Sequence, residues 1–253
     1  MNFRKVSSKT SIREFDSIGE MVAFLNNTPD NGKYSDNSSR NSSKSFTLTS
    51  SYDEAMKLLL NGWSEAANKM NAKLSKVPAT MAKHQRSVYS VAGHTASVPR
   101  YLQGIPTSMI SSVPEKRKTP VVTINHSICY SAMWRAESIM EEGIKALQLI
   151  QSLEASGKRV KLNIICIVED RGCKRGFKVT IKKPGERLNV SKVAFPLAHP
   201  SMLRRLFFKY MEVEPDMPQT FWGYGSPCNN ECTKIYADEL YIPEKVDLEN
   251  FKF

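Results

Sequence analysis

The sequence has no long apolar run. The longest, Leu162 to Val168, is interrupted by Asn163 and is far too short to span a bilayer. The first residues, Met1 to Asp16, are basic, but no apolar segment of the kind found in signal peptides follows them. We therefore expect a protein that is not secreted, does not bind a membrane and stays in the cytoplasm.

Cysteine is scarce and odd in number. The five residues are Cys129, Cys166, Cys173, Cys228 and Cys232. An odd count without a secretion signal predicts free thiols in a reducing compartment. Zinc ribbons usually carry two Cys-x-x-Cys knuckles, and this spacing does not occur here, so free thiols are favoured over a zinc site. No cofactor motif is present, and we predict no cofactor.

Charge is unevenly distributed along the 253 residues, whose net charge is +11. Residues 1–153 carry 19 Lys and Arg against 12 Asp and Glu. Residues 154–210 carry 14 against 4, and residues 211–253 carry 3 against 9. A basic block followed by an acidic tail indicates a polarised surface, which favours nucleic acid or an acidic host protein as a partner.

The composition of the N-terminal part predicts a short helix followed by a linker. Residues 1–26 contain a short helix that Ser17 can cap, with Glu20 at its third position. Residues 27–45 are almost entirely Asn, Ser, Asp, Gly and Lys. Such a composition predicts a flexible linker that buries nothing.

Residues 46–118 predict a helical region with loops rich in proline and glycine. Its main helix begins after Ser50 or Ser51 and includes Gly62 in its interior, where glycine is unfavourable unless close packing requires it. The weak alternation of Ser87 to Ala92 is compatible with a strand.

Residues 119–253 predict an α/β core with a loop-rich acidic tail. Thr119 to Ile128 is rich in β-branched residues and predicts a strand. A helix from Tyr130 to Ser156 and a nearly continuous apolar strand, Val160 to Val168, follow. A strand, helix and strand in this order predict a right-handed βαβ unit with parallel strands.

Beyond this unit the pattern predicts a hairpin and further elements. Asp170 to Gly176 is the expected hairpin loop, and Phe177 to Lys182 alternates as a half-exposed strand at a sheet edge does. Val190 to Phe195 predicts a short strand, and His199 begins a helix. The chain beyond Pro215 is expected to wrap around the body.

The turn after the first core strand reads Asn125-His126-Ser127-Ile128-Cys129. It resembles the metal-binding turn of von Willebrand factor A domains, whose first strand ends in Asp-x-Ser-x-Ser. Asn125 and Cys129 replace two ligands, and an amide and a thiol suit Mg²⁺ poorly. The resemblance covers residues 120–210 and implies a degenerate A-domain-like core without a metal. Asn125, His126 and Ser127 remain candidate ligand contacts, because open α/β sheets bind ligands at strand ends.

Four further pieces are Gly62-Trp63, Pro99 to Met109, Leu149 to Leu162 and His199 to Arg205. In these pieces the chain resembles a family of uncharacterised bacteriophage and prophage proteins. This resemblance implies a viral or mobile-element origin and a bacterial host cell, and no established activity.

Basic side chains of the predicted hairpin are the first candidate site. The candidate nucleic-acid-binding residues are Arg171, Lys174, Arg175, Lys178, Lys182 and Lys183. Within a basic surface of about residues 158–192 they could follow a phosphate backbone. No series of exposed aromatic residues for base stacking accompanies them, and a merely solvated basic surface is the alternative.

Arg204 and Arg205 lie on a helix whose neighbouring apolar residues should be buried. One arginine can extend along the apolar surface while the other faces solvent, or both contact a phosphate. In a third interpretation, one arginine pairs with an acidic residue such as Glu169 or Asp170 inside the fold.

Three functions follow as hypotheses. The first is a non-enzymatic phage accessory protein that binds nucleic acid or a host protein through the basic surface. The second is a protein interaction or assembly module of A-domain type that does not bind nucleic acid. The third is a phage hydrolase or nuclease, for which Glu169-Asp170, or Ser127 or Cys129 with His126, would be needed. We assign no catalytic residue, and the sequence does not set the oligomeric state.

Overall fold

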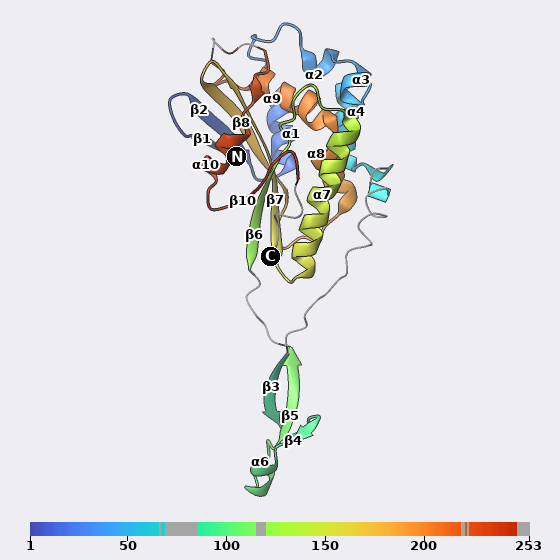
Figure 1. The fold of residues 1–253 in the computed structure, drawn as a ribbon, viewed down its shortest axis with the longest axis vertical. Helices are drawn as coiled ribbons and strands as arrows, with labels where there is room; N and C mark the ends of the chain where they lie inside the picture. The colour runs from blue at the N-terminus through green and yellow to red at the C-terminus, as the bar shows by residue number, and fades with distance from the viewer. Residues whose placement is uncertain (66, 69–84, 115–119, 219–220, 222, 247–253) are drawn as a thin grey trace.

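A computed structural model describes residues 1–65, 67–68, 85–114, 120–218, 221 and 223–246. The protein is of the mixed α/β class. Its body is built on a seven-stranded mixed sheet, and residues 85–114 form a separate three-stranded sheet (Figure 1). Within these residues no helix is long and apolar enough to cross a membrane.

The strands of the body come from both ends of the chain. They are β1 (Asn2–Lys5), β2 (Thr10–Phe15), β6 (Val121–Ser127), β7 (Arg159–Asp170), β8 (Cys173–Lys182), β9 (Ser226–Pro227) and β10 (Leu240–Ile242). Their order is β1-β2-β8-β7-β6-β10, and β9 pairs with the end of β7. The pairs β2–β8, β6–β7 and β6–β10 are parallel, whereas β1–β2 and β7–β8 are antiparallel.

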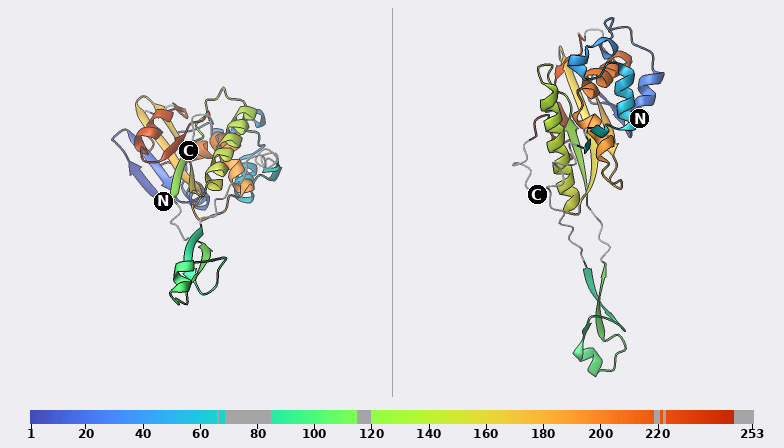
Figure 2. Two further views of the ribbon diagram at one scale, coloured as in Figure 1. Left: turned by 60° about the horizontal axis from the view of Figure 1, so that its bottom comes forward. Right: turned by 90° about the vertical axis from the view of Figure 1, so that its right-hand side faces the viewer.

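The helices lie mostly on one side of this sheet. They are α1 (Ile18–Asn27), α2 (Ser38–Asn41), α3 (Lys44–Thr47), α4 (Tyr52–Asn61), α7 (Ala136–Ala155), α8 (Val190–Ala198), a π-helix (Met202–Phe207) and α9 (Phe208–Val213). A smaller helix, α10 (Asn229–Ile235), packs against β7 on the other side, as the two views of Figure 2 help to see.

The predicted βαβ unit is confirmed. β6 and β7 pair in parallel from Val121↔Arg159 to Ser127↔Ile165, with α7 between them in the chain. Successive side chains of β7 enter two different apolar clusters: Ile164 belongs to the main core under the helices and Ile165 to the smaller one under α10. Because both faces of β7 are covered, its sequence is nearly continuous in apolar residues.

The N-terminus differs from the predicted helical segment. The capped helix is confirmed, since the Ser17 side chain accepts a hydrogen bond from the Glu20 backbone N–H. The strands β1 and β2 precede it, however, and the expectation of a helical N-terminal part was wrong in this respect. Ile12 of β2 is fully buried against the smaller cluster, which explains why this short segment is taken into the sheet.

Residues 27–45 are packed against the body, and the prediction that they bury nothing was wrong. Ser39 is fully buried, and both its N–H and its hydroxyl donate to the Glu212 carboxylate. Asn31 donates through its side chain to the carbonyls of Met211 and Glu214. The polar composition therefore supplies hydrogen-bond partners for buried charged groups.

Helix α4 ends at Gly62, which was expected in the helix interior. Ser51 caps the helix by accepting from the Glu54 N–H, as predicted. Gly62 has φ +90°, and a Cβ there would lie 3.0 Å from the Ser191 carbonyl oxygen. Both the left-handed backbone and the close approach require glycine. The predicted continuation of this helix beyond residue 68 lies outside the described residues.

β8 lies in the interior of the sheet, between β2 and β7, so the prediction of an edge strand was wrong. The parallel pairing from Thr10↔Lys174 to Phe15↔Val179 occupies the edge expected to be free. The predicted hairpin exists, but its turn is only Arg171-Gly172, with φ of 47° and 75°. Two positive φ values give the tight hairpin turn that matches strand twist.

Residues 190–195 form the start of α8, and the prediction of a strand was wrong. The Asn189 side chain accepts from the Lys192 N–H and caps the helix. A short apolar run does not distinguish a buried helix from a strand, and here packing decides. α8 approaches α7 so closely that a Cβ on Gly143 would lie 2.4 Å from the Ala198 Cβ.

The acidic C-terminal part contributes to the core. β10 pairs with β6 from Leu240↔Ile124 to Ile242↔His126. α10 buries Cys232 and Tyr236 on the second face of the sheet. The expected wrapping tail is therefore also an integral part of the sheet.

Residues 85–114, called the arm below, form β3 (Gln85–Ser90), β4 (Thr95–Ala96), α6 (Val98–Leu102) and β5 (Met109–Pro114). β5 is central, and β3 and β4 pair with it in antiparallel fashion. The strand expected from the weak alternation of residues 87–92 therefore corresponds to β3. Figure 1 shows the arm as a unit separate from the body.

Candidate functional site

The predicted ligand turn at the end of β6 is occupied by internal hydrogen bonds. Asn125 and Ser127 are fully buried and face the side of the sheet on which α10 lies. Asn125 donates to Glu239 and accepts from Asn163, and Ser127 donates to Asn229 at 2.7 Å. These side chains hold the C-terminal residues on the sheet.

His126 lies between these two residues in the strand and points to the opposite face, because neighbouring side chains alternate. It is fully buried, and neither ring nitrogen makes a hydrogen bond of normal geometry, although the Ile242 backbone is close. Burial lowers the pKa of His126 to about 4. A Ser127–His126 or Cys129–His126 catalytic pair is therefore not formed, since Ser127 Oγ bonds Asn229 and Cys129 Sγ contacts the Ile167 carbonyl.

The six predicted nucleic-acid contacts do not form one exposed surface. Arg175, Lys178 and Lys182 are 5%, 7% and 2% exposed. Lys174 is partly buried, and only Arg171 and Lys183 are exposed. Lys182 donates to the Val160 carbonyl and pairs with Glu154 at 2.5 Å. The lysine face of β8 was expected to point to solvent, but Glu239 and Tyr236 of the C-terminal part cover Lys178, and Glu154 pairs with Lys182.

The basic block and the acidic tail neutralise each other inside the molecule. The described residues include four ion pairs between them: Lys174 to Glu231 at 2.8 Å, Arg175 to Asp216 at 3.2 Å, Lys178 to Glu239 at 2.6 Å and Lys209 to Glu212 at 3.9 Å. Burial alone would raise the pKa of Glu239, but the hydrogen bonds from Lys178 and Asn125 outweigh it and lower that pKa. Opposite charges that lie in separate parts of the sequence thus meet as ion pairs in the folded protein.

Arg205 is a structural residue. Its guanidinium is fully buried and donates to five oxygens without a carboxylate among them. The acceptors are the Thr49 hydroxyl and the carbonyls of Ser39, Arg40, Ser42 and Thr49. Its three nitrogens thus all donate to oxygens of the protein, and the predicted pairing with Glu169 or Asp170 is not formed. Arg205 instead fixes residues 39–49 on the body.

Arg204 is 3% exposed and is held differently. Nη1 donates to the Phe46 carbonyl at 2.7 Å, and Nη2 donates to the Trp134 carbonyl at 2.8 Å. Its Nε is buried and has no hydrogen-bond partner. Burial lowers the pKa of Arg204, and no salt bridge to it occurs within the part of the chain that the structure describes.

His199 also has a structural role. Its Nδ1 accepts from the Ser201 backbone N–H, and its ring stacks on Phe195 and meets Trp63 edge-on. Burial lowers the pKa of His199 to about 4.

The cysteines are all free thiols in the structure, as predicted, since they form no disulfide. Glu169 accepts from the Cys228 thiol at 3.2 Å and lies 3.9 Å from Lys174. Among the described ranges there is no group of three or more His, Cys, Asp or Glu side chains that could hold a metal ion.

The arm is the region that the sequence predictions overlooked. Between residues 86 and 113 no side chain is buried, and several large apolar ones are mostly exposed. These are Tyr89 (54%), Val91 (71%), Val98 (61%), Tyr101 (71%) and Leu102 (78%). Arg100 links different parts of the arm. Its guanidinium lies 4.2 Å from the Tyr89 ring centre, and its Nε donates to the Thr107 carbonyl.

A local signal could have drawn attention to the arm. Residues 85–114 contain two arginines and no Asp or Glu, which is unusual beside a chain that is 24% charged. The absence of carboxylates and lysines, together with exposed tyrosines and arginines, is typical of an interface.

The chain belongs to a family that is described as a domain of unknown function, DUF7192, whose model matches residues 4–250. Searches of curated proteins and of solved structures gave no significant match. The match spans both the body and the arm.

Proposed function

We propose that this protein is a non-enzymatic assembly module of A-domain type, and that two copies of the chain associate through their arms. The observation that carries the proposal is the contrast within the arm between regular backbone pairing and the lack of any buried side chain from residue 86 to residue 113.

The arm cannot obtain its order from its own side chains. Fixing one residue costs roughly 1–2 kcal/mol of conformational entropy, and an isolated small sheet needs a buried apolar face to offset this. Met109 and Ile110 of the central strand are only half-buried. A partner that covers the apolar residues would supply the missing burial.

A second copy of the chain is the partner that fits. β3 is an edge strand in the described part of the arm, and its outer backbone groups are free for antiparallel addition of another β3. Two arms would pair about a two-fold axis, which is the commonest symmetry of soluble oligomers. The two arginines of each arm, Arg86 and Arg100, give only weak repulsion across such an interface.

The A-domain likeness of the body is part of the same proposal. It is supported by the β6–α7–β7 unit and by the antiparallel hairpin β7–β8 that follows. The altered ligand turn agrees with a module that works through protein contacts, because Asn125 and Ser127 bond other side chains. The phage origin implied by the sequence pieces stays a prediction.

Binding of nucleic acid is the weaker alternative. Of the residues predicted for it, those still exposed are Arg171 and Lys183. Arg171 occupies the turn between β7 and β8, whereas Lys183 follows the other end of β8. The two cations are therefore a whole strand apart, and they do not make one phosphate-binding track.

Sedimentation velocity of the full chain tests the proposal. The wild-type protein is expected to be a dimer, and Val88→Lys with Tyr89→Lys is expected to be a monomer, since lysines on an edge strand oppose pairing. Met133→Lys is the matched control, because Met133 lies in the body, is 90% exposed and should leave the dimer intact.

A monomeric wild-type chain at the highest soluble concentration would contradict the proposal. So would a dimer that persists in the Val88→Lys, Tyr89→Lys protein, because the interface would then lie elsewhere. A monomer whose DNA binding weakens steeply with salt would support the nucleic-acid alternative instead.

A further inference from the structure

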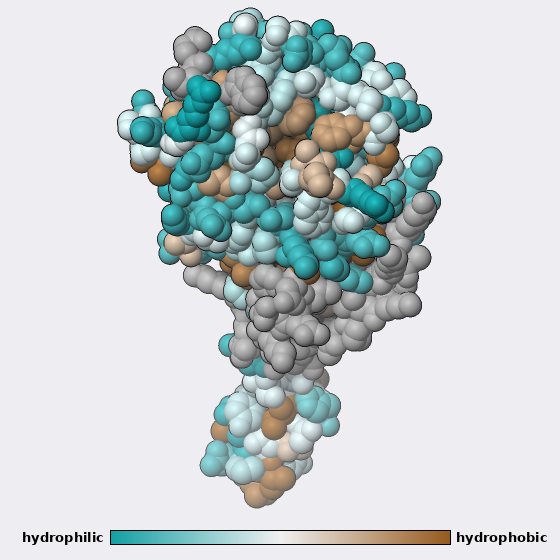
Figure 3. All heavy atoms as spheres, turned by 45° about the horizontal axis from the view of Figure 1, so that its top comes forward, coloured by the Kyte–Doolittle hydropathy of each residue, from teal (hydrophilic) through white to brown (hydrophobic). Residues whose placement is uncertain are grey.

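An apolar cavity lies where β6 and β7 end, against the π-helix. Its volume is about 90 Å³, and its walls include Phe46, Tyr130, Phe207, Phe208 and Tyr224. Ala132 and Pro227, both exposed, lie at its border with solvent. Figure 3 looks toward this end of the body and shows apolar residues gathered among polar ones.

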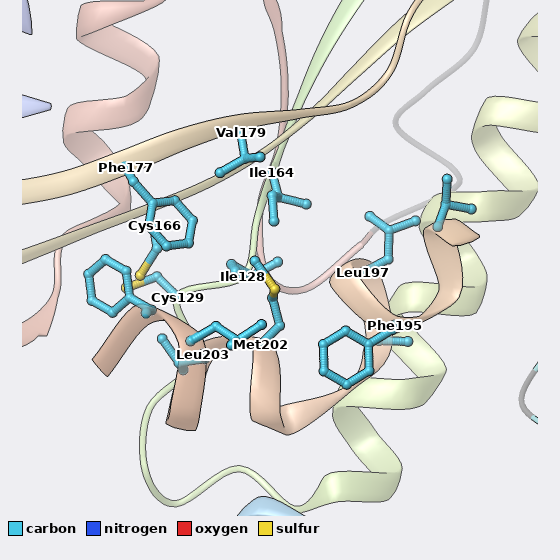
Figure 4. Close-up of a cluster of buried hydrophobic side chains, with 14 of the residues drawn as sticks. Ile128, Cys129, Ile164, Cys166, Phe177, Val179, Phe195, Leu197, Met202 and Leu203 are labelled. Atoms are coloured by element: carbon cyan, nitrogen blue, oxygen red, sulfur yellow. The ribbon is translucent and has the colours of Figure 1, made fainter. Parts of the chain in front are cut away.

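The inner wall of the cavity is continuous with the main core. Cys129 and Leu203 line it, and Figure 4 shows both of them in the buried cluster with Phe177 and Met202. The packed core keeps this wall rigid. The cavity lies at the carboxyl ends of parallel strands, where open α/β sheets commonly bind ligands.

The π-helix supplies three of the lining residues, Leu203, Arg204 and Phe207. A π-helix is rare and is found mostly as a single turn at functional sites. Here it brings a charged residue and two apolar ones to one small cavity.

Among the lining residues that the structure describes, Arg204 is the one with a charged side chain. It is a buried cation with no ion pair within the described ranges, and its Nε–H is unused. Buried charges are usually paired, because the loss of hydration is costly. Arg205 also lacks an ion pair within these ranges, and the terminal nitrogens of both arginines donate to carbonyls. The two differ at Nε, which in Arg205 donates to Thr49 Oγ1 at 2.7 Å.

We infer that this cavity binds a small monocarboxylate, with the carboxylate beside the Arg204 side chain and a short apolar body among the aromatic side chains. A cavity of about 150 Å³ accommodates benzene, so the 90 Å³ here suits a group of roughly three or four carbon atoms. A phosphate group would require more free donors than the Arg204 guanidinium has left.

Calorimetric titration of the full chain with acetate, isobutyrate and benzoate tests this inference. Isobutyrate is expected to bind most tightly, and its uncharged analogue isobutyramide at least about tenfold more weakly, because it lacks the charge that complements the guanidinium. Thermal unfolding should shift upward as isobutyrate is added.

Two variants identify the site. Ala132→Trp places a large ring at the mouth and is expected to weaken isobutyrate binding at least about tenfold. Met133→Trp is the matched control, since Met133 is the adjacent exposed residue and does not line the cavity. Arg204→Gln should also lose binding, and its circular dichroism separates this from loss of the fold.

The inference is overturned if none of the three carboxylates binds, or if isobutyramide binds as well as isobutyrate. Equal binding in the Ala132→Trp and wild-type proteins would also overturn it. The oligomeric state is a separate measurement, so failure here does not decide the role of the arm.

Discussion

The body and the arm show opposite uses of polar and apolar side chains. In the body, Arg175, Lys178, Lys182 and Arg205 are buried and bonded to acidic groups or carbonyls. In the arm, tyrosine, valine and leucine are exposed, and no side chain between residues 86 and 113 is buried. The buried basic residues of the body thus hold its elements together, whereas the apolar side chains of the arm lie exposed.

The largest effect is expected from Arg205→Ala. It removes hydrogen bonds to buried carbonyls of residues 39–49 and leaves a cavity, so the free energy of unfolding should fall by about 3–5 kcal/mol. Urea unfolding followed by circular dichroism measures this. Arg187→Ala, at an exposed position, is the control and should change stability by less than about 0.5 kcal/mol. If the unfolding free energy of Arg205→Ala falls by no more than that of the control, buried basic side chains do not stabilise the body.

The next effect is a loss of stability at mildly acid pH. His126 and His199 have folded-state pKa values of about 4, below the ordinary 6.5, so protonation favours the unfolded chain. Stability is complete above pH 6.5 and is lost as the pH falls toward 4, on the order of 2 kcal/mol for each histidine at pH 5.

Urea midpoints at pH 7.5 and pH 5 test this. His126→Leu should reduce the pH dependence, because it removes the titrating group without leaving a hydrogen-bond partner unsatisfied. If the wild-type midpoint is the same at both values, the burial of these histidines does not control acid stability.

A smaller loss is expected from Gly143→Ala in the body. The new methyl group would lie 2.4 Å from the Ala198 Cβ, so α7 and α8 must move apart. We expect a loss of about 1–3 kcal/mol in unfolding free energy. Gly185→Ala is the control, because no atom lies within 4 Å of the position that its new methyl group would take and its φ is not in the left-handed region. Equal unfolding free energies of the two variants would show that α7 and α8 move apart without loss of stability.

The smallest effect is expected in the arm. Leu102→Ser removes a side chain that is 78% exposed, so the unfolding free energy of the body should change by less than about 0.5 kcal/mol. Thermal unfolding of the body, measured under conditions in which the chain is monomeric, checks this. A large loss would mean that the arm packs on its own body, and the difference between the two regions would disappear.

Parts of the fold were predictable because they depend on neighbouring residues. The cap of α1 at Ser17 and the parallel pairing of β6 with β7 followed from local pattern and from the length of the connection. The helix that replaces the strand expected at Val190 to Phe195 was not predictable, since a short apolar run fits a helix and a strand equally well.

The candidate site was less predictable than the fold. Asn125, His126 and Ser127 were located correctly at a strand end, but their partners Glu239 and Asn229 come from more than 100 residues further along the chain. The exposure of the arm was missed because its sequence alternates only weakly, and alternation does not reveal whether another layer covers a face.

The sequence by itself determined the order of the βαβ unit, the free thiols and the uneven charge, because these depend on residue type and spacing. Only the tertiary structure decided that the basic hairpin is buried and that the arm is not. The physical reason is that a charge is neutralised by whichever groups the fold brings near it. Lys174 meets Glu231, and Lys178 meets Glu239, only after α10 and β10 have packed on the sheet.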